Sequence, residues 1–333
     1  MLIHASAPTR IDLAGGTLDI WPLYLFHDKA QTLNAAISIR ARCVVRPRSD
    51  RRLVIASEDA QQRVEVDHWS QLRDSHDLKL LGKLLHYFHA EGLELHTRSE
   101  SPVGAGIAGS SALNIAVCGA LNEWTGGRRT PDELFQIAMN VEAQAIDVPT
   151  GVQDYRPAFY GGISAIELGV DGIRRVPLAV PTQELQQRLV LAYTNASRNS
   201  GINNWDVTKR HIDGDRNVQA RFARIRDIAA GMRNALERRD WPDVGRQIAA
   251  EWENRKRLAP GVTTPEIDAM LDAARTAGAL AGKVCGAGGG GCLFCFCEPE
   301  AVRAVRDALA GAGARLLDFQ IEEKGLIIEK RPA

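Results

Sequence analysis

The spacing of apolar residues changes several times along this chain, and each spacing predicts a different kind of element. Apolar and polar residues roughly alternate in 36–47 and 93–98, which is typical of strands with one buried face. In 77–90 and 216–238 the apolar residues recur every three or four positions, which is typical of amphipathic helices. The short apolar run at 189–194 predicts a buried strand.

Capping and turn residues mark the ends of further elements. Thr130-Pro131-Asp132-Glu133 predicts the start of a helix that runs to about Ile146, because threonine caps the first turn and proline fits its first position. Val170-Asp171-Gly172 predicts the turn of a hairpin between 161–168 and 173–178. We also expect strands at 52–57, 283–285, 292–296, 316–321 and 325–329, and helices at 110–124, 241–258, 264–277 and 299–311.

Helices and strands are mixed without the regular alternation of a parallel α/β fold, so the predicted fold class is α+β. The length of 333 residues suits two ordinary domains. Pro181 lies between the predicted hairpin and the next strand. We therefore place a domain boundary there, between 1–180 and 181–333.

Composition narrows the class of protein. With 45% hydrophobic and 25% charged residues, the chain has the profile of a folded, water-soluble protein. Its 41 basic and 41 acidic side chains cancel, which argues against a broad cationic face for nucleic acid. No apolar run reaches the length of a membrane helix and the first residues lack a signal-peptide pattern, so we expect a cytoplasmic protein with no membrane partner.

Six cysteines occur in the chain, and in a cytoplasmic protein they are expected to be reduced and buried. Cys292, Cys295 and Cys297 form a close group in an apolar run. A metal site is the less favoured interpretation of that group, because no second pair of ligands has zinc spacing.

The segment from Ser101 to Ala112 is a glycine-rich turn that opens a predicted helix. Glycines let the backbone approach a ligand closely, and the free amides at a helix start favour phosphate. The Gly-Lys-Ser/Thr ending of a Walker A loop is missing. The spacing Gly104-x-Gly106-x-x-Gly109 fits a dinucleotide fingerprint and keeps a dehydrogenase as an alternative, although no acidic residue ends a following strand. A tight structural turn is an equal alternative.

Two other segments are candidates for chemistry. Five of the six residues in 286–291 are glycine, which indicates close approach of the backbone to a ligand or to another loop. Near the N-terminus, Arg10 and Asp19 flank the pair Gly15-Gly16 in an otherwise apolar segment. These two charged residues form either a surface ion pair or a clamp for sugar hydroxyl groups.

Together and in this order, the three motifs resemble the GHMP kinase family, over nearly the whole chain. Within it the chain resembles most the D-glycero-D-manno-heptose 7-phosphate kinase group, at 13–19, 33–37, 151–154, 197–201 and 283–291. The resemblance implies an N-terminal ribosomal-protein-like α+β domain that binds ATP, and a ferredoxin-like C-terminal domain. Thr17 and Leu18 differ from the first motif of that group, so the sugar stays open.

The resemblance also implies roles for individual residues. Asp154 would be the catalytic base, with Arg10 beside it. Gln153 and Asp154 compete for this family position, and only Asp154 has the chemistry of a base. Ser111 and Glu142 would bind Mg²⁺, with Asp147 as an alternative to Glu142. The residues implied for ATP phosphate binding are Gly104, Ala105, Gly106, Gly109, Ser110 and Ser111. Those implied for substrate binding are Arg10, Asp19, Asn34, Asp154, Arg198, Gly288 and Gly289.

The expected function is ATP-dependent phosphoryl transfer to a hydroxyl group of a sugar or sugar phosphate, and family members of the nearest group act on the anomeric hydroxyl. The cofactors implied are ATP and Mg²⁺, and the partner is a small molecule. A kinase for a non-sugar alcohol such as mevalonate and a non-catalytic nucleotide-binding sensor are the alternatives. The sequence is compatible with a homodimer.

Overall fold

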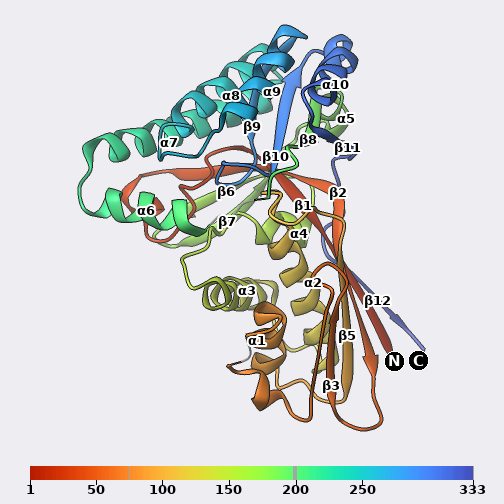
Figure 1. The fold of residues 1–333 in the computed structure, drawn as a ribbon. Helices are drawn as coiled ribbons and strands as arrows, with labels where there is room; N and C mark the ends of the chain where they lie inside the picture. Colours follow the sequence, from red (N-terminus) through yellow and green to blue (C-terminus); the bar gives the residue numbers. More distant parts are fainter. Residues whose placement is uncertain (75, 198–200, 333) are drawn as a thin grey trace.

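The computed structural model describes residues 1–74, 76–197 and 201–332, and it contains two β-sheets with helices packed on both (Figure 1). The first sheet has the strand order β12-β1-β2-β5-β3-β4, with β6 pairing β2 and β7 pairing β6. Its strands are β1 (Leu2–Ala14), β2 (Ala30–Pro47), β3 (Leu53–Ser57), β4 (Gln62–Val66), β5 (Leu93–Ser99), β6 (Ile163–Gly169), β7 (Gly172–Pro177) and β12 (Ile327–Arg331).

Strand β2 is the axis of this sheet. It pairs with β1 along most of its length, with β6 at 30–35 and with β5 at 41–47. The prediction placed its start at residue 36, because 30–35 includes the polar residues Gln31, Thr32 and Asn34. All three are buried, so the apolar pattern does not reveal this half of the strand.

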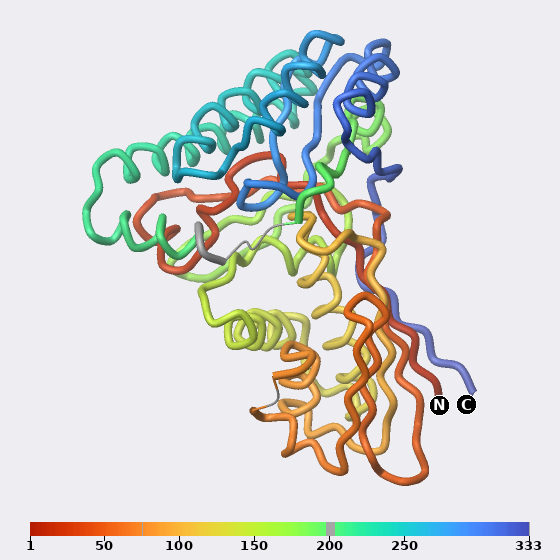
Figure 2. Tube along the Cα trace, in the orientation of Figure 1, coloured from red at the N-terminus to blue at the C-terminus, as the bar shows by residue number. Residues whose placement is uncertain are grey.

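The last strand returns to the first one. β12 pairs antiparallel with the start of β1, with Leu2 opposite Arg331, so both chain ends lie side by side (Figure 2). The division of the chain into two domains at residue 180 stays a prediction. Strand β12 belongs to residues 181–333 but lies in the first sheet.

Four helices form the first core with this sheet, namely α1 (Lys79–Tyr87), α2 (Gly109–Trp124), α3 (Pro131–Ile146) and α4 (Tyr155–Tyr160). The start of α3 is as predicted. The Thr130 hydroxyl accepts a hydrogen bond from the backbone N–H of Glu133, and the Glu133 carboxylate accepts one from the backbone N–H of Thr130. Sequence spacing did not predict α4, which is only six residues long.

The second sheet is antiparallel with the order β11-β8-β10-β9. Its strands are β8 (Leu189–Tyr193), β9 (Ala279–Val284), β10 (Cys292–Cys297) and β11 (Arg315–Leu317). The remaining α-helices are α5 (Thr182–Gln186), α6 (Gly201–Ile212), α7 (Arg216–Arg238), α8 (Trp241–Arg255), α9 (Pro265–Thr276) and α10 (Val302–Gly311), and the short 3-10 helices are η1 (Leu23–Phe26), η2 (Trp69–Leu72) and η3 (Pro299–Ala301).

Two of the predicted C-terminal elements differ from the structure. The strand expected at 316–321 is limited to Arg315–Leu317, and the one expected at 325–329 lies at Ile327–Arg331. Each of these strands pairs along one edge only, so its apolar pattern is weak. Within residues 1–74, 76–197 and 201–332, every helix is too short or too polar to span a bilayer.

All six cysteines are buried free thiols, as predicted. Side chains alternate along β10, so Cys295 and Cys297 enter one core while Cys292 enters another. Burial raises the pKa of Cys295 to about 12. Nowhere in the described part of the chain are three His, Cys, Asp or Glu side chains grouped so that they could hold a metal ion.

Four buried charges join the two sheets. Lys283 of β9 lies with its Nζ atom 2.9 Å from Oδ1 of Asp12 on β1, and Arg255 of α8 lies with Nη1 3.2 Å from Oδ2 of the same carboxylate. Glu251, one helical turn before Arg255, lies 3.6 Å from both cations. Although burial alone would raise the pKa of Asp12, the charges of Lys283 and Arg255 lower it. We call these four residues the charge cluster.

Replacing Lys283 by methionine is expected to lower the free energy of unfolding by about 3–5 kcal/mol, because Asp12 and Glu251 would share one cation in a buried site. Chemical denaturation of the purified variant measures this. Lys209→Met, which removes an exposed pair with Asp213, is the control and should leave the denaturation midpoint unchanged. If Lys283→Met is as stable as the wild type, the charge cluster does not stabilise the junction between the sheets.

Candidate active site

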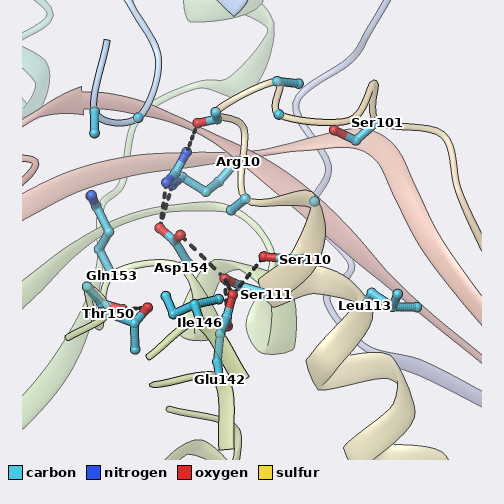
Figure 3. A pocket seen from close by; sticks show the side chains of 18 of the residues that line it. Arg10, Ser101, Ser110, Ser111, Leu113, Glu142, Ile146, Thr150, Gln153 and Asp154 are labelled. Carbon is cyan, nitrogen blue, oxygen red and sulfur yellow. Dashed lines mark hydrogen bonds and ion pairs between the residues drawn. The ribbon is translucent and has the colours of Figure 1, made fainter. Parts of the chain in front are cut away.

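A cleft of about 510 Å³ lies beside the start of α2 (Figure 3). Its walls come from the glycine-rich segment 101–109, the first turn of α2, the end of α3, the loop 149–154, the turn at 17–20 and residues 286–287. The cleft therefore brings together all three sequence motifs and the segment before α4.

The glycine-rich segment 101–109 contacts the second glycine loop, 286–291, through backbone atoms. Gly106 has a φ of 74°, and a Cβ atom there would lie 2.5 Å from the carbonyl oxygen of Cys285. A Cβ atom on Gly291 would lie 2.7 Å from the carbonyl oxygen of Ala105, which accepts a hydrogen bond from the backbone N–H of Cys292. The glycines at these positions are thus needed for contact between two loops.

Two glycines predicted to contact substrate lie elsewhere. The backbone N–H of Gly289 donates to the carbonyl oxygen of Val262, and a Cβ atom on Gly288 would lie 2.3 Å from the same oxygen. Both residues are outside the cleft lining, and Gly286 and Ala287 line the cleft instead. The sequence singled out this loop, but it could not show which part of a glycine run faces the neighbouring loop and which part lines the cleft.

The start of α2 is suited to anion binding. No described side chain caps its N-terminus, and Ala108, the residue before the helix, has a φ of 63°. The N–H groups of the first turn have no partner within the helix, and the helix dipole favours negative charge there. Ser110 and Ser111 lie in this turn and line the cleft, as do Gly104, Ala105, Gly106 and Gly109.

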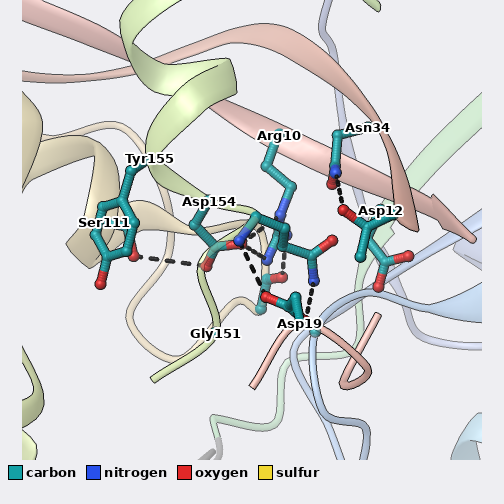
Figure 4. A network of polar contacts seen from close by, with 12 residues as sticks. Arg10, Asp12, Asp19, Asn34, Ser111, Gly151, Asp154 and Tyr155 are labelled. Atoms are coloured by element: carbon teal, nitrogen blue, oxygen red, sulfur yellow. Dashed lines mark hydrogen bonds and ion pairs between the residues drawn. The ribbon is translucent and has the colours of Figure 1, made fainter. Parts of the chain in front are cut away.

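Arg10 of β1 holds Asp154 and the glycine-rich segment at once (Figure 4). Its Nε and Nη2 atoms donate to Oδ1 of Asp154 at 2.9 and 2.6 Å, and its Nη1 atom donates to the carbonyl oxygen of Gly106 at 2.9 Å. Burial alone would lower the pKa of Arg10, but the charges of Asp154 and Asp12 raise it. The arginine is therefore a permanent cation in this cleft.

Glu142 of α3 is a buried carboxylate surrounded by hydroxyl groups. It accepts hydrogen bonds from Ser110 at 2.7 Å, from Ser111 at 3.1 Å and from Tyr155 at 2.8 Å. The Ser111 hydroxyl also lies 3.5 Å from Oδ2 of Asp154. Burial raises the pKa of Glu142, and none of the ion pairs among the described residues gives it a cationic partner.

The alternatives to Glu142 and Asp154 are now distinguished by position. Asp147 lies at the surface, where its Oδ2 atom pairs with Nζ of Lys79 at 2.5 Å. Gln153 faces Asp19 and not Arg10. Glu142 as a metal ligand and Asp154 as the base stay predictions.

Asp19 does not form an ion pair with Arg10, so of the two interpretations of these residues the surface ion pair is wrong. Its Oδ2 atom accepts a hydrogen bond from the backbone N–H of Gln153 at 3.0 Å, and a Cβ atom on Gly151 would lie 2.2 Å from that oxygen. Burial and the nearby charge of Asp154 raise the pKa of Asp19 to about 6. Asp19 remains in the cleft lining as a poorly solvated carboxyl group.

Sequence analysis missed the residues that support this wall of the cleft, which are Asp12, Thr17, Glu251 and Arg255. Arg255 donates from Nη2 to the Thr17 hydroxyl at 2.9 Å and to the carbonyl oxygen of Gly286 at 2.6 Å. A possible signal was the pair Glu251 and Arg255, spaced one turn apart in a predicted amphipathic helix. Such a pair is usually exposed, so the pattern alone favoured a surface role.

Of the remaining predicted site residues, Asn34 is not in the cleft. Asn34 is fully buried on β2, where its side-chain nitrogen donates to the Thr32 hydroxyl, and it lies outside the cleft lining. Arg198 falls outside the described residues.

Two family models match the chain, GHMP kinases N terminal domain over residues 78–162 and GHMP kinases C terminal over residues 232–315. The chain belongs to the GHMP kinase family. This GHMP kinase is 28% identical to a D-glycero-alpha-D-manno-heptose 7-phosphate kinase of Campylobacter jejuni, over 97% of this chain and 98% of the relative. It is also 28% identical to a mevalonate kinase of Methanothermobacter thermautotrophicus, over 98% of this chain and 100% of the relative.

Solved structures agree with the fold. A D-glycero-D-manno-heptose 1-phosphate kinase from Bacteroides thetaiotaomicron matches with a TM-score of 0.80 and 25% identity, covering 99% of this chain and 100% of that chain. The predicted α+β class and the family resemblance are therefore confirmed. Family membership makes this GHMP kinase a small-molecule kinase with ATP as the phosphate donor.

Replacing Asp19 by asparagine should make stability less dependent on pH. Because the pKa of Asp19 is raised to about 6, folding favours its protonated form. Its contribution to stability is complete below the unfolded pKa near 4 and is lost as the pH rises through 6. Asp19→Asn should therefore be more stable than the wild type by about 2–3 kcal/mol at pH 7.5, and the difference should vanish near pH 4.

Denaturation curves at several pH values test this expectation. Asp171→Asn, in the exposed turn between β6 and β7, is the control and should follow the wild type at every pH. An Asp19→Asn variant that is less stable than the wild type at pH 7.5 would contradict the expectation.

Proposed function

We propose that this GHMP kinase transfers the γ-phosphoryl group of ATP to a hydroxyl group of a sugar or sugar phosphate, with the anomeric hydroxyl as the predicted acceptor. The observation that carries the proposal is the position of Asp154. Arg10 fixes this carboxylate 3.5 Å from the Ser111 hydroxyl, beside a helix start with free amides. A general base thus lies next to a place suited to phosphate groups.

The phosphate groups of ATP would lie against the segment from Gly104 to Gly109 and the first turn of α2. Backbone amides there supply hydrogen bonds that need no further reorganisation. Ser110 and Ser111 add two hydroxyl groups on the same turn. Arg10 contacts Oδ1 of Asp154, whereas Ser111 lies near Oδ2. The positive charge of Arg10 offsets negative charge that builds up during phosphoryl transfer.

Ser111 and Glu142 would hold Mg²⁺. The donor set fits this ion, because a carboxylate and a hydroxyl are hard oxygen ligands. Glu142 is also a buried carboxyl group with no cation beside it among the described residues, and a bound divalent ion would stabilise its charged form. When bound, Mg²⁺ would offset the negative charge of the phosphate groups.

In the reaction, Asp154 orients the acceptor hydroxyl and takes its proton. The acceptor oxygen then forms a bond to the γ-phosphorus, the bond from this phosphorus to the bridging oxygen breaks, and ADP leaves. Positioning supplies most of the rate acceleration in phosphoryl transfer, and the bidentate contact from Arg10 provides it for Asp154.

The polar wall around Asp19 supports a sugar as acceptor. Asp19 and Asp154 offer carboxylate oxygens that accept hydrogen bonds, and burial and the charge of Asp154 raise the pKa of Asp19 even though the backbone N–H of Gln153 donates to it. A sugar supplies several hydroxyl donors. The relatives named as heptose phosphate kinases support the same class, whereas the relative named as mevalonate kinase supports the alternative. A cytoplasmic location and a homodimer stay predictions.

An ADP-release screen tests the proposal. Free sugars, sugar phosphates that include heptose 7-phosphate, and mevalonate are each supplied with ATP and Mg²⁺. We expect ADP release with a member of the sugar set and none with mevalonate. ADP release with mevalonate alone would show that the acceptor is a non-sugar alcohol. ATP binding without ADP release for any alcohol would indicate a nucleotide-binding sensor.

Asp154→Asn should lower kcat by about 10²–10⁴-fold with the acceptor found in the screen, because the proton acceptor is lost. ATP binding, measured by calorimetry, should stay close to that of the wild type. Asp147→Asn is the matched control and should keep full turnover, since Asp147 lies at the surface. Turnover that survives in Asp154→Asn would remove this residue from the reaction.

Glu142→Gln should raise the Mg²⁺ concentration for half-maximal nucleotide affinity by at least about tenfold, because a carboxylate ligand becomes neutral. Titration calorimetry of ATP at several Mg²⁺ concentrations measures this without relying on turnover. Glu123→Gln, near the end of α2 and paired with Lys330, is the control. An unchanged Mg²⁺ dependence would exclude Glu142 as a ligand.

A further inference from the structure

The turn at residues 15–20 holds Thr17 in a backbone conformation that is rare for its type. The backbone N–H of Leu18 donates to the carbonyl oxygen of Gly15, and Thr17, the third residue of this turn, has a φ of 75°. Turns with positive φ at that place usually have glycine or asparagine there, and a β-branched residue is an outlier. Such outliers persist where the surroundings impose them, often at ligand sites.

The surroundings here are the charge cluster. Gly16 is pressed against it, since a Cβ atom at Gly16 would lie 2.3 Å from Oδ2 of Asp12 and 2.6 Å from Nη1 of Arg255. Arg255 is almost fully buried and is fixed by contacts with Asp12 and with the carbonyl oxygen of Gly286. The turn therefore cannot shift without moving a buried arginine.

The Thr17 hydroxyl is left with a free proton. Arginine can only donate, so the bond from Nη2 of Arg255 uses a lone pair of the Thr17 oxygen. Among the described residues none accepts the hydroxyl hydrogen of Thr17. The adjacent guanidinium charge also polarises the hydroxyl, which makes it a better donor.

Thr17 lines the same cleft as Asp19 and Asp154. The two carboxylates can accept hydrogen bonds from hydroxyl groups of a ligand, whereas the Thr17 hydroxyl can donate one to a ligand oxygen. We propose that Thr17 is a specificity-determining residue that donates a hydrogen bond to an oxygen of the acceptor, and that Arg255 is the positioning residue that aims its hydroxyl. The inference rests on the proposed kinase function but not on the identity of the sugar.

The first test compares Thr17→Val with Thr17→Ser, using the acceptor found in the ADP-release screen. Valine keeps the branched shape and the same backbone constraint, and it removes the hydroxyl. We expect kcat/KM for the acceptor to fall by about tenfold in Thr17→Val, as for the loss of one hydrogen bond. Thr17→Ser, which keeps the hydroxyl, should stay within about twofold of the wild type, and KM for ATP should be unchanged in both.

Thr9→Val is the matched control. Thr9 is a buried residue on β1 whose hydroxyl donates to the carbonyl oxygen of Ile39, and it lies outside the cleft lining. The same chemical change there should leave kcat/KM for the acceptor unaltered. A Thr17→Val variant with wild-type kcat/KM would overturn the proposal, as would an equal rise of both KM values that Thr17→Ser does not rescue.

A double-mutant cycle tests the role of Arg255. Arg255→Lys keeps the charge but loses the fork that contacts Thr17 and Asp12 together. If Arg255 acts through Thr17, the losses in acceptor kcat/KM for Thr17→Val and Arg255→Lys should not add in the double variant. Additive losses would contradict the positioning role, and the comparison of valine with serine at Thr17 decides the proposal even if Arg255→Lys does not fold.

The proposed function and the role of Thr17 can be contradicted separately. A wild-type protein that phosphorylates no sugar removes the proposed function, while Thr17 can still be tested with whichever alcohol is phosphorylated. If the wild type and Thr17→Val phosphorylate a sugar equally well, only the proposed role of Thr17 is contradicted.

Discussion

The arrangement of the cleft depends on a set of opposite charges that are removed from water. Asp12, Glu251, Arg255 and Lys283 come from β1, α8 and β9, and each is almost completely buried. A buried charge without a partner is strongly destabilising, so these elements are held in one relative position. Because Arg255 also contacts Thr17 and Gly286, the same charges set the distance between the first motif and the second glycine loop.

Backbone contact between two glycine loops adds a second constraint. Gly106 lies against Cys285, and Gly291 lies against Ala105, at distances that leave no space for a side chain. The glycines thus allow the glycine-rich segment 101–109 to be supported on one side by another loop. Its other side, with the uncapped start of α2, stays open to the cleft. Support from one side and open amides on the other are what preorganised anion binding requires.

Three carboxyl groups share the cleft, and their surroundings separate their chemistry. Asp154 is held by the bidentate contact with Arg10, Glu142 is enclosed by three hydroxyl groups, and Asp19 has a backbone N–H as its main partner. Burial raises the pKa of both Glu142 and Asp19. These differences fit a base, a metal ligand and a substrate contact, and they arise from packing because the side chains themselves are nearly alike.

The sequence by itself determined the α+β class, the family, most long helices and the segments that form the cleft, because periodic apolar spacing and glycine motifs are local properties of the chain. It also indicated Arg10, Ser111, Glu142 and Asp154, which the structure brings together. Only the tertiary structure decided that Asp19 contacts Gln153 and forms no ion pair with Arg10, that Gly286 and not Gly288 faces the cleft, and that Arg255 supports Thr17. Each of these facts depends on contacts between residues far apart in the chain, and burial of a charge cannot be read from local spacing.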